Sequence, residues 1–252
     1  MKKTLGVAIA LLICGFASTG AGQQPAQAPV PAHELYRIIF FKAAPGKLPD
    51  LIDAYKNAPV ADNMTPRPMV FRHQSGADWD LMVIYPLGAK ASMDANAPAP
   101  SEAVRRFKER VMGDYAWHAD TYASGPPLAV VQRALAVPPP IRAQAGESGG
   151  LYLIEASVAL AGHHDALGRF LDRDMAAARA RGAVKFEHVQ GDAWDFLLIF
   201  RYASWSEYAA AESDPAADDD ARKQGFADAD AIGVEFRTHI SSHHDTFASR
   251  VQ

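Results

Sequence analysis

The 252-residue chain contains one cysteine, Cys14, which lies in an apolar segment near the N-terminus. A single cysteine excludes an internal disulfide and any metal site built from several thiolates. The sequence also lacks phosphate-binding loops, dinucleotide fingerprints, serine nucleophile elbows and CxxC pairs. No single motif therefore identifies a reaction, and function has to be inferred from the organisation of the chain.

Positive charge is also scarce. The chain has 25 Lys and Arg against 29 Asp and Glu, a net charge of −4, and no basic cluster of the kind that binds nucleic acid. After the N-terminal segment, no apolar stretch is long enough to cross a bilayer. The composition predicts neither a nucleic-acid partner nor a membrane span.

The N-terminus has the pattern of a secretory signal peptide. Lys2 and Lys3 precede an apolar run, residues 4–17, and small residues follow at 18–22. Cleavage there would remove Cys14 and release a thiol-free protein to the periplasm or the exterior. We therefore expect a signal peptide at residues 1–22 and a disordered spacer, rich in Pro, Gln and Ala, at residues 23–33.

Two short passages of the first half return in the second half, in the same order. Residues 71–81 (FRHQSGADWDL) return as residues 186–196 (FEHVQGDAWDF), with five of eleven positions identical. Residues 118–124 (HADTYAS) return as residues 243–249 (HHDTFAS), with five of seven identical. Such repetition predicts an internal duplication, with repeats at residues 34–137 and 150–252 joined by a linker at residues 138–149.

Each repeat shows the same order of expected elements. The order is a strand, an amphipathic helix, a pair of strands joined by a glycine-containing turn, and a second helix. The second helices are expected at about residues 101–123 and 231–248. A fourth strand is expected at residues 128–137 in the first repeat, and the sequence leaves open whether the second repeat has one. The pattern β-α-β-β-α-(β) is that of a ferredoxin-like α+β unit.

This order, with the turn Ala44-Pro45-Gly46 before an amphipathic helix and aromatic residues at the start of the strand pair, resembles the dimeric α/β-barrel superfamily. That superfamily includes antibiotic-biosynthesis-type monooxygenases and NIPSNAP-type proteins. The resemblance implies two tandem ferredoxin-like units packed as a pseudo-dimeric α/β barrel. The chain would then be a monomer with an internal pseudo-twofold axis, or a homodimer of it. The resemblance also implies a cavity between sheet and helices, where a substrate or heme can sit.

The first repeated passage supplies four candidate ligand-binding residues. His73 and His188 occupy matching places, and each is followed by a tryptophan, Trp79 or Trp194. A neutral imidazole facing a pocket could act as base, ligand or hydrogen-bond donor. Alternatively, each histidine forms a structural hydrogen bond at the end of its strand, near the turn, and the tryptophans belong to the core. A duplicated fold also duplicates its structural needs, so repetition is compatible with both interpretations.

The second repeated passage offers a metal site. His118 and His243 follow Asp114 and His239 by four residues, a spacing that puts both members of a pair on one face of a helix. Two such helices facing each other would suit Zn²⁺, Fe²⁺ or Mn²⁺. In the alternative interpretation, the polar residues cap a helix or contact its partner.

Charged residues interrupt the first strand of each repeat, Arg37 in one and Glu155 in the other. A charge in an apolar strand is costly unless paired, so the two residues form either a buried ion pair or part of a site. Small and polar residues replace aromatic ones near Glu155. We therefore expect the second repeat to hold the larger and more polar cavity and the first-repeat pocket to be packed shut. The expected lining residues are Tyr152, Glu155, His188, Trp194, His239 and His243.

Three functional classes stay open. The first is an exported protein that binds a small molecule in the cavity of the second repeat. The second is a monooxygenase-like or heme-linked oxidoreductase. The third is a metal-binding protein that uses the histidines of the expected helices. The sequence requires neither heme nor a divalent metal, and it does not decide whether the protein is an enzyme.

Overall fold

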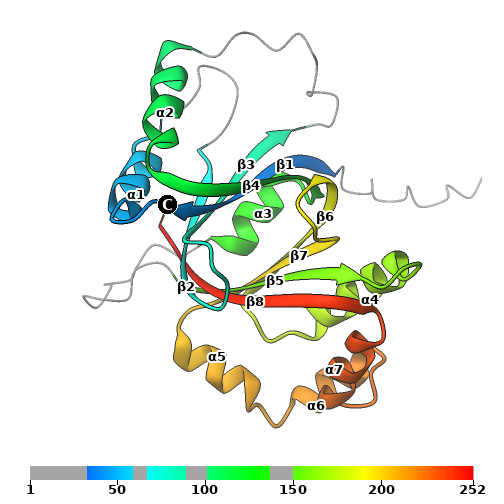
Figure 1. Ribbon diagram of the computed structural model, residues 1–252. Helices are drawn as coiled ribbons and strands as arrows, with labels where there is room; N and C mark the ends of the chain where they lie inside the picture. Colours follow the sequence, from blue (N-terminus) through cyan, green and yellow to red (C-terminus); the bar gives the residue numbers. More distant parts are fainter. Residues whose placement is uncertain (1–32, 59–66, 89–100, 137–149, 252) are drawn as a thin grey trace, which may run out of the picture. The chain divides into compact units, whose positions relative to one another are not determined.

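A computed structural model describes residues 33–58, 67–88, 101–136 and 150–251 of the chain. In these ranges eight strands form a closed antiparallel barrel, accompanied by seven helices (Figure 1). The strands are β1 (Glu34–Ala43), β2 (Met69–Ser75), β3 (Leu81–Gly88), β4 (Tyr115–Gly125), β5 (Leu151–Ala159), β6 (Gly182–Gly191), β7 (Phe196–Tyr202) and β8 (Ile240–Arg250). The helices are α1 (Leu48–Lys56), α2 (Glu102–Met112), α3 (Leu128–Leu135), α4 (His164–Ala177), α5 (Trp205–Glu212), α6 (Ala217–Lys223) and α7 (Ala229–Arg237).

The order of strands around the barrel is β1-β3-β2-β8-β5-β7-β6-β4. The strands of residues 34–125 are therefore neighbours in the order β4-β1-β3-β2, and those of residues 151–250 follow the matching order β8-β5-β7-β6. Two joints, β2 with β8 and β4 with β6, close the barrel. The predicted α+β barrel architecture is confirmed.

Strand alternation divides the side chains between the barrel interior and an outer layer. In β1, Ile38 and Phe40 point into the interior core, whereas Ile39 and Phe41 join a separate outer core. Both faces are covered, which explains why these strands read as continuous apolar runs. Helix α3 closes one end of the barrel, because its Val131 side chain belongs to the interior core.

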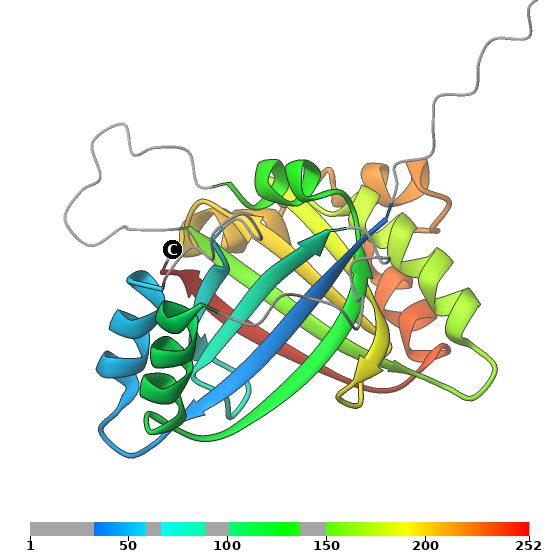
Figure 2. The same ribbon diagram turned by 90° about the horizontal axis from the view of Figure 1, so that it is seen from above.

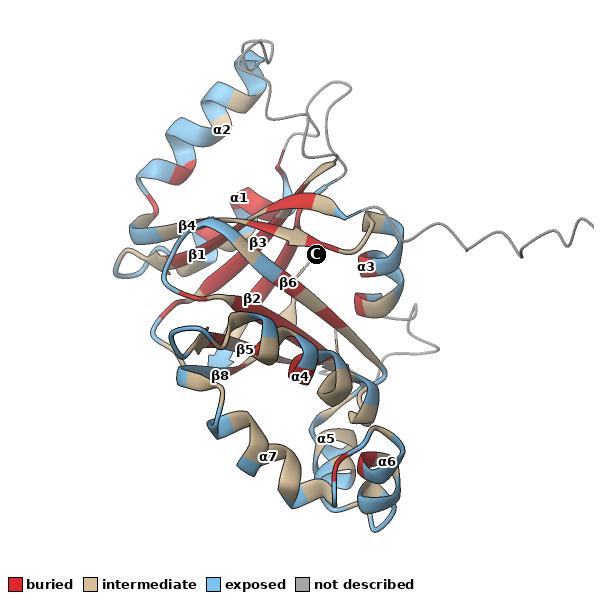
Figure 3. Ribbon diagram, turned by 90° about the vertical axis from the view of Figure 1, so that its right-hand side faces the viewer, coloured by how far each residue is buried: buried red, intermediate tan, exposed pale blue. Residues whose placement is uncertain are grey.

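The remaining helices cover the outer faces. Helices α1 and α2 contact each other outside the first four strands, and α4 contacts α6 and α7 outside the others (Figure 2). Ser101 caps the N-terminus of α2, because its hydroxyl accepts a hydrogen bond from Val104 N at 3.3 Å. Val111 is its one buried side chain, and most of the helix is exposed (Figure 3). Among the described residues, no helix combines the length and the apolar character needed to cross a membrane.

The predictions of three elements were wrong. The helices expected at residues 101–123 and 231–248 end at Met112 and Arg237, and β4 and β8 follow. In β4 every second residue from Thr121 onward is buried, which is the period of a strand. The second half of the chain therefore has a fourth strand, β8. The strand expected at residues 128–137 is helix α3 over its described part, since Val131 and Leu135 are buried four residues apart.

Candidate functional site

The two repeated passages meet each other at the joints of the barrel. His73 in β2 lies opposite Ala248 in β8, and His188 in β6 lies opposite Ala123 in β4. The glycines of the two turns come very close to the neighbouring strand. A Cβ on Gly76 would lie 2.3 Å from Asp245 O, and one on Gly191 would lie 2.1 Å from Asp120 O. Only glycine fits at such a close approach, where φ is also +120° and +130°.

In each half, the aspartate of the Trp-Asp pair accepts a hydrogen bond from the end of that half's first strand, β1 or β5, and so holds the turn against it. Asp80 Oδ2 accepts a hydrogen bond from Ala43 N at 2.8 Å, and Asp195 Oδ2 accepts one from Ala159 N at 2.7 Å. Asp80 O also accepts from His73 N at 2.9 Å, with an equivalent bond in the second half. Much of the repetition therefore serves the assembly of the barrel.

The histidines of the first repeated passage are half-buried and lie beside their tryptophans. The ring centroids of His73 and Trp79 are 5.2 Å apart, and those of His188 and Trp194 are 5.8 Å apart. In each histidine Nε2 is buried and has no hydrogen-bond partner among the described residues. Burial lowers the pKa of His73, which favours the neutral imidazole.

Both tryptophans line a cavity of about 570 Å³ at the barrel end where the β2–β3 and β6–β7 turns lie. Tyr152 does not line this cavity. Its side chain is fully buried in the interior core, and its hydroxyl donates to Leu135 O at 2.9 Å.

The geometry expected for a metal site was wrong. His118 and His243 lie on strands, and Asp114 and His239 precede those strands in turns. The helical spacing that would put the two members of each pair on one face is therefore absent. Among the residues that the structure describes, no three His, Cys, Asp or Glu side chains are arranged to hold a metal.

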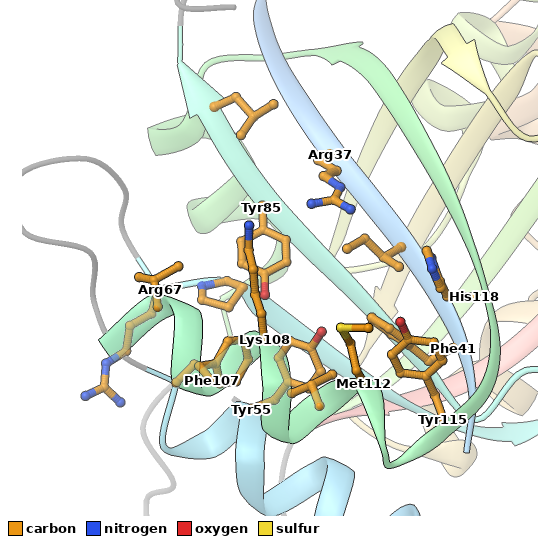
Figure 4. Close-up of a pocket in the computed structure, with 16 residues that line it drawn as sticks. Arg37, Phe41, Tyr55, Arg67, Tyr85, Phe107, Lys108, Met112, Tyr115 and His118 are labelled. Atoms are coloured by element: carbon orange, nitrogen blue, oxygen red, sulfur yellow. The ribbon is translucent and has the colours of Figure 1, made fainter. Parts of the chain in front are cut away.

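A cavity of about 400 Å³ lies between α1, α2 and the outer face of β1, β3 and β4 (Figure 4). Its walls are largely aromatic. The Phe41 ring lies 5.6 Å from that of Tyr55 and 5.2 Å from that of Tyr115, and the Tyr55 ring meets Phe107 edge-on at 5.4 Å. The cavity is within the size range of small-molecule sites, roughly 300–1,000 Å³.

Polar groups gather on the strand side of this cavity. Arg37 and His118 both line it, and both bind the carboxylate of Asp120. Arg37 Nε and Nη2 lie 3.0 and 2.9 Å from Asp120 Oδ1, and His118 Nδ1 lies 3.1 Å from Oδ2. Burial alone would lower the pKa of Arg37, but its hydrogen bond and attraction to Asp120 raise it overall. The Arg37 guanidinium thus stays charged. With Nδ1 of His118 directed at a carboxylate, Nε2 is left as the basic nitrogen.

Two phenols complete the polar side. Tyr55 and Tyr85 line the cavity, and their side chains interact with each other. Burial raises the pKa of both phenols, so both are neutral at physiological pH. Lys108 of α2, an exposed side chain, also lines the cavity. The cavity therefore combines aromatic walls with hydroxyl, imidazole and cationic groups.

A third cavity, of about 350 Å³, lies beside β5, β7 and the helices of the second half. The pocket of the first half, which is the cavity of about 400 Å³ described above, was expected to be packed shut. This expectation was wrong, because that cavity is no smaller than the one in the second half. The aromatic side chains of β1 and α1 form the wall of the first-half cavity without filling it. Of the six residues expected to line the second-half cavity, Glu155 alone does so. Tyr152 and Glu155 are an odd number of residues apart, so alternation turns them to opposite faces of the sheet.

No family model and no curated protein matches this chain. Several solved structures match in fold, among them three with TM-scores above 0.5. An anthrone oxidase-like protein aligns with a TM-score of 0.56 and 13% identity over 87% of this chain and 92% of its own. A candidate monooxygenase from Lactobacillus acidophilus gives 0.53 and 13% over 87% and 95%. One from Fusobacterium nucleatum gives 0.52 and 10% over 88% and 94%. The chain thus has the dimeric α/β-barrel fold, as its sequence pattern predicted.

Proposed function

We propose that the cavity between α1, α2 and the strands β1, β3 and β4 binds a flat, mostly apolar molecule that carries a weakly acidic hydroxyl group. The observation that carries this proposal is the pairing of aromatic walls with the His118–Asp120 couple on one side. Aromatic rings favour a flat apolar body. The basic Nε2 of His118 can accept the acidic proton, and Asp120 stabilises the imidazolium that results.

The charges around the cavity support an acidic ligand. Arg37 is already matched by Asp120, so protonation of His118 would leave one positive charge on the strand side. Lys108 adds a second cation from α2. An anionic oxygen would offset this charge, whereas a cationic ligand would add to it.

A direct test compares 1-naphthol with 1-methoxynaphthalene, which keeps the rings but has no acidic proton. We expect 1-naphthol to raise the melting temperature of the protein and the methoxy compound to have a much smaller effect. The His118→Asn variant should lose most of the 1-naphthol effect. His243→Asn is the matched control, since His243 is the equivalent residue of the second half and is similarly exposed, 39% against 37%. Equal stabilisation by the two compounds, or loss only in His243→Asn, contradicts the proposal.

Oxygenase chemistry is a second candidate, favoured by the same histidine and by the names of the fold neighbours, an anthrone oxidase-like protein and candidate monooxygenases. The His118 imidazole would remove a proton from the methylene of a substrate such as anthrone. The carbanion would then react with dioxygen, giving the quinone with one oxygen atom while the other leaves as water. Consumption of one dioxygen per anthrone, lost in His118→Asn, would support this. Anthrone oxidation at the same rate in the wild type and in His118→Asn would refute the oxygenase proposal.

We also propose that the barrel is a tandem duplication and that the chain is complete as a monomer. The matched joints support this, since the pairs His73–Ala248 and His188–Ala123 occupy equivalent positions. Light scattering should give the mass of one chain, still folded, at micromolar concentration. A dimer that unfolds when it dissociates would contradict this.

Export is proposed from the N-terminal pattern of Lys2, Lys3 and the apolar run that follows. Sequencing the N-terminus of the protein from the periplasm or medium of its host should give a start close to residue 22. An intact Met1 on protein confined to the cytoplasm would contradict export.

A further inference from the structure

The two halves of the barrel differ in how they balance one carboxylate. In the first half, Asp120 of β4 is neutralised by Arg37 of β1. The equivalent aspartate in the second half is Asp245, because Thr246 pairs with Ile154 as Thr121 pairs with Ile38. Leu153 occupies the place of Arg37 there. The second half therefore lacks the arginine that balances the aspartate in the first half, and the basic group beside Asp245 is His243, whose Nε2 lies 3.7 Å from Asp245 Oδ2.

The second half adds negative charge instead. Glu155 lies directly opposite Asp245 in the β5–β8 ladder, and like charges directly opposite are destabilising. Glu155 also lines the 350 Å³ cavity, where three further acidic side chains converge from different helices: Asp174 of α4, Glu212 of α5 and Asp230 of α7.

The one basic residue that lines this cavity is already engaged. Arg179 Nη1 lies 2.6 Å from Asp214 Oδ2, and its Nη2 lies 2.5 Å from Asp220 Oδ2. The rest of the wall is apolar and includes Leu153, Phe200 and Ile232. The part of the chain that the structure describes shows no side-chain arrangement suited to a metal ion. The unmatched charge therefore faces a partly apolar chamber.

The carboxyl group of Glu155 is directed into this cavity without a partner. No hydrogen bond or ion pair joins it to another described residue, although it lies deep in the structure and is only partly exposed. Burial, followed by the charges of Asp245, Asp174 and Glu212, raises the pKa of Glu155 to about 8. Burial raises the pKa of Asp174 to about 6. Burial and the neighbouring carboxylates disfavour the ionised form of this unpaired acid, and a bound cation would stabilise that form.

We propose that this second-half cavity is a binding site for a small organic cation, a primary ammonium compound with an apolar body. The ammonium group would donate hydrogen bonds to Glu155 and supply the charge that Arg37 supplies in the first half. The apolar body would pack against Leu153 and Phe200. This site is separate from the cavity proposed for an acidic ligand, and the two select ligands of opposite charge.

The test uses benzylammonium, with benzyl alcohol as the neutral compound of the same shape, and isothermal titration calorimetry of the full-length protein. We expect benzylammonium to bind and benzyl alcohol to bind at least ten-fold more weakly. The Glu155→Gln variant should lose at least ten-fold in affinity for benzylammonium. The control is Glu102→Gln, since Glu102 is an exposed glutamate of α2 whose loss should leave the affinity unchanged.

Proton release gives a second readout, one that a merely structural role for Glu155 would not produce. The ammonium favours the ionised carboxyl, so binding at pH 7 should release protons in the wild type and fewer in Glu155→Gln. Titrations in buffers of different ionisation enthalpy measure this number. Circular dichroism of Glu155→Gln checks that it is folded. Equal affinities for the two compounds, an unchanged affinity in Glu155→Gln, or no binding at millimolar benzylammonium would overturn the proposal.

Discussion

Replacing Glu155 by glutamine should stabilise the protein at alkaline pH. In the folded chain, burial and the neighbouring carboxylates raise the pKa of Glu155 from 4.5 to about 8. The folded state therefore holds a proton that the unfolded state has lost between these two pH values. Because the folded state binds more protons in this window, the free energy of unfolding falls as pH rises from about 4.5 to about 8. Below the window the penalty is absent.

The magnitude follows from the size of the pKa difference. One pKa unit corresponds to about 1.4 kcal/mol, so the whole difference sets an upper limit of about 5 kcal/mol. The carboxyl group can be reached through the cavity, and solvent there weakens the repulsion. We therefore expect Glu155→Gln to be more stable than the wild type by roughly 1–3 kcal/mol at pH 8.5 and about equal at pH 4.5.

Urea denaturation followed by tryptophan fluorescence at the two pH values measures this difference. Asp174 also has a raised pKa, but it is present in both proteins, and its contribution largely cancels. Glu102→Gln should show no comparable gain at pH 8.5, because Glu102 is exposed and paired with Arg106. If Glu155→Gln changes stability equally at both pH values, or destabilises at pH 8.5, the argument from repulsion is wrong.

Two further predictions concern the assembly of the barrel. Gly191→Ala should cost at least about 3 kcal/mol in thermal or urea unfolding, because its Cβ would collide with Asp120 O, whereas Gly46→Ala should cost only about 1–2 kcal/mol. Gly46 also has a positive φ, but nothing lies within 4 Å of an added Cβ there; equal costs would show that the close approach is unimportant. Tyr152→Phe should cost about 1 kcal/mol, since it loses the bond to Leu135 O while Arg250 Nη1 still donates to that oxygen at 3.0 Å. A cost above about 3 kcal/mol would mean that Tyr152 has a role beyond this hydrogen bond.

The barrel could be predicted because the sequence patterns that specify its strands and turns are local and occur twice. The repeated passages identified matching elements, and the glycines at 76 and 191 marked turns that the structure confirms. The segments after α2 and α7 were misread because Asp114 and His118 have a spacing that also suits a helix. The alternation at Thr121 and Ala123 was the better signal, since both are buried toward the barrel interior.

The site was harder to predict because no short pattern specifies a cavity. Arg37 stood out as a charge inside an apolar strand, but its partner Asp120 is 83 positions away in the sequence. No pattern in the sequence singles out Tyr55 and Tyr85, and only the packing of α1 and α2 shows that they border a cavity. Aromatic bulk near Arg37 suggested a filled pocket, whereas volume depends on how the helices sit over the sheet.

The central claim is that the cavity beneath α1 and α2 is a ligand-binding site, and filling it tests the claim most directly. Val104 lines this cavity from α2, and Ala177 lines the second-half cavity from α4. The affinity for 1-naphthol should be measured by titration calorimetry in Val104→Trp and in the control Ala177→Trp, both checked for folding by circular dichroism. We expect at least a ten-fold loss in Val104→Trp and almost none in Ala177→Trp. An unchanged affinity in folded Val104→Trp, or a loss confined to Ala177→Trp, would contradict the claim.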